Sequence, residues 1–140
     1  MNEPPMDDLP EGEDPENKYK GSLRPMGELC FNLLGEAIRA GATEIQIRPV
    51  VEPFVEPRIQ LRLRVKGDLV PGTTDLPWPH YRHLISRLKK MGSMDVAERR
   101  MPQSGKMRFK YGEKLYNMTL QIQPIHEYES CVIYLNEKDF

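Results

Sequence analysis

The side chains best suited to bind a charged ligand gather between Arg82 and Lys110. That interval contains nine lysines and arginines and only two acids, Asp95 and Glu98. Near its centre, the adjacent Arg99 and Arg100 are followed by a proline and a glycine, so a rigid turn could present both guanidinium groups. The planar guanidinium suits phosphate because it can donate two hydrogen bonds at once. The same residues fit a solvated basic face in which Glu98 pairs with a neighbour, and physics alone leaves both interpretations open.

Motifs of a complete active site are missing from the sequence. It contains no GxxxxGK[ST] phosphate loop, no GxGxxG fingerprint, no HExxH and no GxSxG elbow. His80 and His83 could share a helical face, but neither has a carboxylate or cysteine partner nearby, so no metal site is expected. Cys30 and Cys131 lie about 100 residues apart in apolar runs and are expected to be buried thiols. We therefore expect this chain not to be an enzyme by itself.

The charges are divided unevenly along the chain. Residues 1–20 hold seven acids and two lysines, a net −5, whereas the remaining 120 residues hold 18 basic and 14 acidic residues, a net +4. The segment 1–21 is rich in proline and acids and poor in large apolar residues, so we expect a disordered tail there and one domain over residues 22–140. No signal peptide and no apolar run of about 18–20 residues is present, which favours a cytoplasmic protein.

Apolar periodicity predicts the elements that position the basic stretch. A helix is expected from about Pro25 to Gly41, and a second from about Pro79 to Met91. Alternating apolar residues predict strands, and the prolines at 49, 53 and 57 are expected to form a loop. The strands cover residues 43–48, 58–66, 69–70, 107–110, 114–123 and 130–135, and residues 94–101 are ambiguous, with a short helical turn as one interpretation. The order predicts an α+β fold, a single mostly antiparallel sheet with both helices on one face.

Three blocks of the sequence form a specific pattern: EAIRAGATEIQIRP at residues 36–49, RLRVKGDL at 62–69 and LISRLKKMGSMDVAERRMPQSGK at 84–106. Together they resemble the N-terminal domain of the type II secretion and type IV pilus assembly ATPases. The stretch 84–106 is similar to the family's LISRIKxMxxxDIAERRxPQDGR, residues 36–49 to its EAIxxGASDIHIEP, and residues 62–69 to its RFRIDGVL. The blocks occur in the family's order and cover about residues 26–135. The resemblance implies a PAS-like domain that is linked to a RecA-like ATPase domain and packs on a neighbouring subunit of a hexameric ring.

The resemblance also implies roles for particular residues. Some arginines of this domain reach toward nucleotide held by the ATPase domain, which makes Arg62, Arg64, Arg99 and Arg100 the candidates for phosphate or interface contacts. The rest of the expected basic face consists of Arg87, Lys89, Lys90 and Lys106. No cofactor is expected in this chain, and ATP would enter only if it were shared with a partner's ATPase domain.

Several polar positions depart from the family pattern. The family's Asp-Ile-His is Glu44-Ile45-Gln46 here, Lys66 replaces the aspartate of IDG, and Ser104 replaces that of PQDG. The chain also stops at Phe140, where the family continues into the Walker A domain. The apolar framework is kept while charged positions have drifted, which indicates a retained fold with altered nucleotide-linked duties.

Two functions follow from the resemblance, and two others rest on weaker grounds. We expect a binding and assembly module that docks on a RecA-like secretion or pilus ATPase, or on another secretion-machinery protein, at the inner face of the inner membrane. The alternative is one half of a split ATPase that contributes arginines in trans. Association of the chain with further copies of itself, as a homo-oligomer, is also left open by the sequence. Nucleic-acid binding is disfavoured by the few aromatics near the basic stretch and by the net charge of −1. A small-ligand pocket rests on fold analogy alone.

Overall fold

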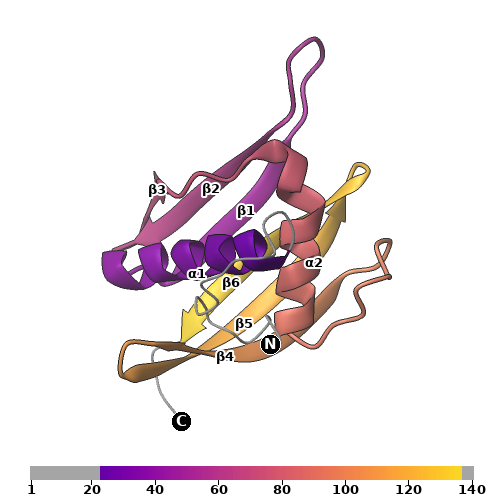
Figure 1. Cartoon of the computed structure of the whole chain (residues 1–140). Helices are drawn as coiled ribbons and strands as arrows, with labels where there is room; N and C mark the ends of the chain where they lie inside the picture. The colour runs from indigo at the N-terminus through magenta and orange to yellow at the C-terminus, as the bar shows by residue number, and fades with distance from the viewer. Residues whose placement is uncertain (1–22, 137–140) are drawn as a thin grey trace.

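The structure, a computed structural model, describes residues 23–136 (Figure 1). The prediction for the tail 1–21 lies outside these residues. The elements in chain order are helix α1 (Leu23–Ala40), strands β1 (Glu44–Val50), β2 (Arg58–Val65) and β3 (Asp68–Pro71), the 3₁₀ turn η1 (Trp78–His80), helix α2 (Tyr81–Met91), and strands β4 (Gln103–Tyr111), β5 (Lys114–Ile125) and β6 (Tyr128–Asn136).

The strands form one six-stranded sheet in the order β3-β2-β1-β6-β5-β4, and every neighbouring pair is antiparallel. The register aligns the apolar residues of different strands. Ile45 lies opposite Leu63 on one side and Ile133 on the other, and Ile133 lies opposite Leu120. All four side chains are buried, so one face of the sheet carries a continuous apolar row.

Both helices cover this apolar face (Figure 1). Leu33, Leu34 and Ala37 of α1 and Leu84 and Leu88 of α2 are fully buried in the same core as the strand residues. Helix α1 ends at Ala40, and the φ of 74° at the following Gly41 provides the left-handed conformation that commonly terminates a helix. The expected α+β architecture, one sheet with two helices on one face, is confirmed, and the sheet is antiparallel throughout.

Two local predictions differ from the structure. Pro49 was expected to begin a loop, but it lies within β1 opposite Ile59. The pairing of β1 with β6 ends at Ile47, so the next residues of β1 have no strand on that side, and a residue without an N–H is tolerated there. Residues 94–101 form turns and bends and contain no helix.

The second face of the sheet carries polar side chains. Arg62 and Arg64 of β2 alternate with the core residues Leu61 and Leu63, so they point away from the helices. Lys106 and Arg108 lie on the same face at the far edge strand, because Lys106 pairs with Thr119 of β5 while the buried Met107 faces the core. We call this surface the open sheet face.

Candidate docking site

The loop between α2 and β4 contains the central motif of the basic stretch, and its backbone is held by its own acidic side chains. We call residues 92–102 the arginine loop. The Asp95 carboxylate accepts a hydrogen bond from the amide of Ala97 at 3.0 Å. The Glu98 carboxylate accepts bonds from the amides of Arg100 and Met101 at 2.7 and 3.1 Å. Glu98 therefore fixes the turn that displays the arginines, rather than pairing with a neighbouring basic side chain.

Residues at the start of β4 close the loop from its other end. The side-chain amide of Gln103 donates to the carbonyls of Asp95 and Glu98 at 3.0 and 3.3 Å, and its oxygen accepts from the Asp95 amide at 2.9 Å. Gly105 passes so close to the end of α2 that an added Cβ would lie 2.1 Å from the Gly92 carbonyl oxygen. The glutamine and the glycine of the PQSG sequence thus have structural roles, which the sequence alone did not reveal.

Lys89 of α2 is buried beneath the arginine loop and bonds to it. It does not lie on an exposed basic face, contrary to the expectation from the sequence. Its side chain is 1% exposed, its ammonium group forms an ion pair with Glu129 of β6 at 2.8 Å, and it donates to the Glu98 carbonyl at 2.6 Å. A buried charge is tolerated when it is paired and hydrogen-bonded. Because Glu129 lies 40 positions further along the chain, nothing in the local pattern indicated this pairing.

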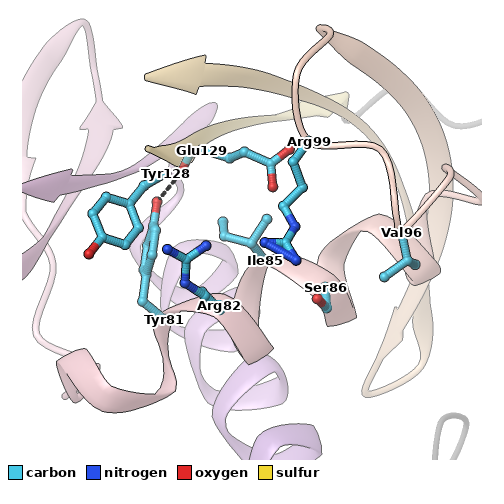
Figure 2. A pocket seen from close by; sticks show the side chains of 8 residues that line it. All are labelled: Tyr81, Arg82, Ile85, Ser86, Val96, Arg99, Tyr128 and Glu129. Carbon is cyan, nitrogen blue, oxygen red and sulfur yellow. Dashed lines mark hydrogen bonds between the residues drawn. The ribbon is translucent and has the colours of Figure 1, made fainter. Parts of the chain in front are cut away.

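A shallow cleft lies between α2, the arginine loop and the start of β6 (Figure 2). We call it the arginine cleft; it is lined by Tyr81, Arg82, Ile85, Ser86, Val96, Arg99, Tyr128 and Glu129. Arg82 and Arg99 extend into it from different elements, α2 and the loop (Figure 2). Its volume is about 60 Å³, whereas typical small-molecule pockets hold roughly 300–1,000 Å³. This cleft suits a protruding side chain better than a nucleotide.

Aromatic side chains form one wall of the arginine cleft. Trp78 stacks on Tyr81 at 5.3 Å between ring centroids, and Tyr128 meets Trp78 edge-on at 5.1 Å. The Tyr81 hydroxyl donates a hydrogen bond to the Glu129 carbonyl (Figure 2), and burial raises the pKa of Tyr81, so the hydroxyl remains protonated. The Arg82 guanidinium lies 4.6 Å from the centre of the Tyr128 ring. Arg82 was not among the site residues expected from the sequence.

The four arginines suggested by the family resemblance lie in two separate places. Arg99 and Arg100 are exposed on the arginine loop, next to the helices, whereas Arg62 and Arg64 lie on the open sheet face. The sheet lies between the two pairs. They cannot converge on a single phosphate group within one copy of this domain.

The two arginines on the open sheet face differ in their surroundings. Arg64 donates to the Glu44 carboxylate at 2.9 Å and to the Gly67 carbonyl at 3.1 Å. A hydrogen bond from Gln46 and the contact with Arg64 lower the pKa of Glu44, so this carboxylate stays ionised beside the arginine. The Nε of Arg62 is buried and has no hydrogen-bond partner among residues 23–136.

The remaining basic residues do not form a single face. Arg87 is half-buried on α2, with its guanidinium against Gly27 of α1. Lys90 is exposed at the end of α2, and Lys106 is exposed on the open sheet face. With Lys89 buried, the proposed basic face therefore divides into separate positions on both sides of the sheet.

Neither cysteine chemistry nor metal binding is supported in the described part of the chain. Cys30 and Cys131 are free and buried, and burial raises the pKa of Cys30 to about 12. Within residues 23–136 no group of three or more histidine, cysteine or acidic side chains could hold a metal ion. Among the same residues, neither α1 nor α2 has the length and apolarity needed to cross a bilayer.

The aromatic residues near the basic stretch pack against one another. The rings of Phe109 and Tyr111 are 6.2 Å apart, and each lies within 6 Å of the Phe31 ring of α1. Trp78 and Tyr81 are stacked on each other as part of the cleft wall. Rings engaged in this way do not offer the stacking platform that proteins use for single-stranded nucleic acids.

Comparison with known proteins gives a consistent result. The family model described as type II/IV secretion system protein matches residues 20–139. The chain is 32% identical over 139 residues to the type II secretion system protein E of Klebsiella pneumoniae and to the type II secretion system ATPase E of Vibrio cholerae, and each match covers 97% of this chain. It is 33% identical over 106 residues, 76% of its length, to the type IV pilus assembly ATPase PilB of Thermus thermophilus.

These matches cover only part of the bacterial relatives. The chain spans 24% of the length of the two type II secretion proteins and 11% of the pilus protein. The matched part is the N-terminal part of those proteins. The chain therefore belongs to the type II/IV secretion system protein family and corresponds to an N-terminal domain of its secretion and pilus ATPases.

Proposed function

We propose that this domain is a binding and assembly module that docks on a RecA-like ATPase domain of a secretion or pilus machinery, or on another protein of that machinery. The observation that carries the proposal is the construction of the arginine loop. Its backbone is fixed by Asp95, Glu98 and Gln103 and anchored by the buried Lys89. A loop with this many internal bonds presents Arg100 in a defined place at low entropic cost, which favours a specific contact.

The four candidate arginines are suited to different tasks. Arg100 is exposed and, among the described residues, its side chain makes no hydrogen bond or ion pair, so it is available to a carboxylate or phosphate of a partner. Arg62 has a buried Nε that lacks a partner, and a docked acidic side chain could bind it once the Arg62 side chain turns outward. Arg64 is occupied by Glu44, so we expect its contribution to docking to be smaller.

Docking is tested with the purified chain and a secretion or pilus ATPase from the same cell. We expect a complex by calorimetry, weakened about tenfold or more by Arg100→Ala, since an interface arginine often contributes about 1–2 kcal/mol or more. Lys114→Ala provides a matched control, because Lys114 is an exposed basic residue at the start of β5, directly after the β4–β5 turn. The absence of a complex with the wild-type chain, or equal weakening by both variants, would contradict the proposal.

The second candidate is a domain that contributes an arginine in trans to nucleotide hydrolysis. The exposed Arg100 supports this candidate, since an arginine supplied by another chain can raise phosphoryl-transfer rates by several orders of magnitude. The separation of Arg62 and Arg64 from the arginine loop weighs against all four residues serving one nucleotide. We would measure ATP hydrolysis by the partner with and without this chain. A rate that the chain leaves unchanged while it still binds would support docking and reject the catalytic role.

A further inference from the structure

The loop between β1 and β2 carries an exposed apolar tip. We call residues 51–57 the β1–β2 tip; it projects beyond the rest of the described chain (Figure 1). Phe54 is fully exposed, at 104% relative accessibility, and Val51 and Val55 are about half exposed. A group of exposed apolar side chains at a projecting point is typical of a contact surface.

The conformation of the tip presents Phe54 outward. Its φ of 62° lies in the left-handed region, which is uncommon for a bulky residue. Pro53 and Pro57 restrict the backbone on either side, and the Val55 amide donates to the Glu52 carbonyl at 3.4 Å. An unfavourable backbone conformation that is held by its surroundings often marks a functional position.

The charges on the tip indicate what kind of surface it fits. Glu52 and Glu56 flank Phe54, and both are exposed. Arg58 lies 3.7 Å from Glu52, with both side chains about half exposed, so this pair is loosely held and solvated. An apolar ring between two carboxylates fits a recess with apolar walls and arginines or lysines at its rim. The same carboxylates disfavour an anionic lipid surface.

The arginine cleft, which lies between α2, the arginine loop and the start of β6, is such a recess. Its apolar lining includes Ile85, Val96 and Tyr128, and Arg82 and Arg99 reach into it (Figure 2). Within residues 23–136 neither arginine forms an ion pair with a carboxylate, since the nearby Glu129 is held by Lys89. A volume of about 60 Å³ admits the edge of an aromatic ring, whose face can then lie on a guanidinium plane.

We propose that the β1–β2 tip of one copy of this chain docks in the arginine cleft of a second copy. The tip does not occupy the cleft of its own chain, because Phe54 is fully exposed. Glu52 and Glu56 would approach Arg82 and Arg99, which gives the contact its charge complementarity. Tip and cleft are different surfaces, so the contact is head-to-tail, and a pair of copies keeps one free tip and one free cleft to which further copies can add. This association does not depend on the proposed contact between Arg100 and an ATPase domain.

The head-to-tail arrangement can be tested by complementation between two defective variants. In sedimentation equilibrium from about 10 μM to about 1 mM, a range that detects weak association, we expect the wild-type mass to rise above the 16.3 kDa of one chain. Phe54→Ser removes the aromatic ring of the tip, and Arg99→Glu reverses a charge of the cleft. Each variant alone should therefore remain at 16.3 kDa. An equimolar mixture should form dimers that grow no further, because it keeps one intact tip and one intact cleft per pair.

Leu115→Ser serves as the control. Leu115 is also an exposed apolar residue, but it lies near the start of β5, next to the turn that joins β4 to β5. This variant should associate as the wild type does. The proposal is overturned if the wild type remains a monomer throughout, if Phe54→Ser associates unchanged, or if the mixture of defective variants stays monomeric. Binding of a monomeric wild type to phosphatidylglycerol vesicles, lost in Phe54→Ser, would likewise overturn it and assign the tip to a lipid surface.

Discussion

Replacing Lys89 with methionine removes the positive charge that lies buried between α2 and β6. The change leaves the Glu129 carboxylate buried without its partner and removes the bond to the Glu98 carbonyl of the arginine loop. Breaking a buried ion pair by removing one partner typically costs about 3–5 kcal/mol. Methionine has nearly the volume of the lysine stem, so the loss would arise from charge and hydrogen bonding and not from a cavity. We therefore expect the free energy of unfolding to fall by about 3–5 kcal/mol.

The assay is urea and thermal unfolding of the wild type, Lys89→Met and Lys90→Met. The neighbouring Lys90 is exposed, so its replacement should change stability by less than about 0.5 kcal/mol. At about 2–8 °C of melting temperature per kcal/mol for domains of this general size, Lys89→Met should melt at least about 6 °C lower. Adding Glu129→Leu to Lys89→Met should recover part of the loss, because an apolar pair avoids an unpaired buried charge. Equal effects of Lys89→Met and Lys90→Met would refute the role of Lys89 as the anchor.

Three further experiments test other parts of the structure. Gly105→Ala should destabilise the domain by about 1–3 kcal/mol in urea unfolding, since its Cβ would meet the Gly92 carbonyl oxygen at 2.1 Å, whereas Ser104→Ala should have little effect. Glu44 has a lowered pKa in the folded state, so its stabilising contribution is present above the ordinary carboxyl pKa of about 4.3 and is lost as the pH falls through the lowered value. The stability difference between wild type and Glu44→Gln should accordingly shrink below about pH 4 in unfolding series, and a difference independent of pH would contradict this. Cys30, with its pKa raised to about 12, should react with a thiol reagent at neutral pH only when the domain is unfolded.

The helices and strands were predictable because their apolar residues repeat with the period of each element. Ile45 and Ile47 alternate with polar residues, and Leu84 and Leu88 lie one turn apart, so each pattern by itself indicates which face is buried. Pro49 was misplaced because a proline's effect depends on where the neighbouring strand ends, here at Ile47. That boundary is a property of the tertiary pairing and is not encoded locally.

The candidate site was predictable in part. The sequence indicated the arginine pair and the turn that presents it, but it did not separate Arg100 from the residues that build the turn. Glu98 and Gln103 hold the loop through bonds to backbone groups, which no spacing rule identifies. Lys89 was assigned to the surface because lysine is rarely buried, and its partner Glu129 lies on a distant strand. Long-range pairing determined the role of each of these residues.

The four arginines suggested by the family resemblance also depend on the tertiary structure for their roles. In the sequence they appear as two similar basic pairs, and the resemblance gave them one role. The structure places one pair on each side of the sheet, and Arg64 forms an ion pair with Glu44. Position in the fold, rather than residue type, therefore determines which of them can contact a partner.

The central claim, that this domain is a docking module, is tested most directly by its affinity for a secretion or pilus ATPase from the same cell. The account predicts a complex that Arg100→Ala weakens about tenfold or more and that Lys114→Ala leaves unchanged. Wild-type chain that fails to bind the ATPase, or binding that is indifferent to Arg100, would contradict the account.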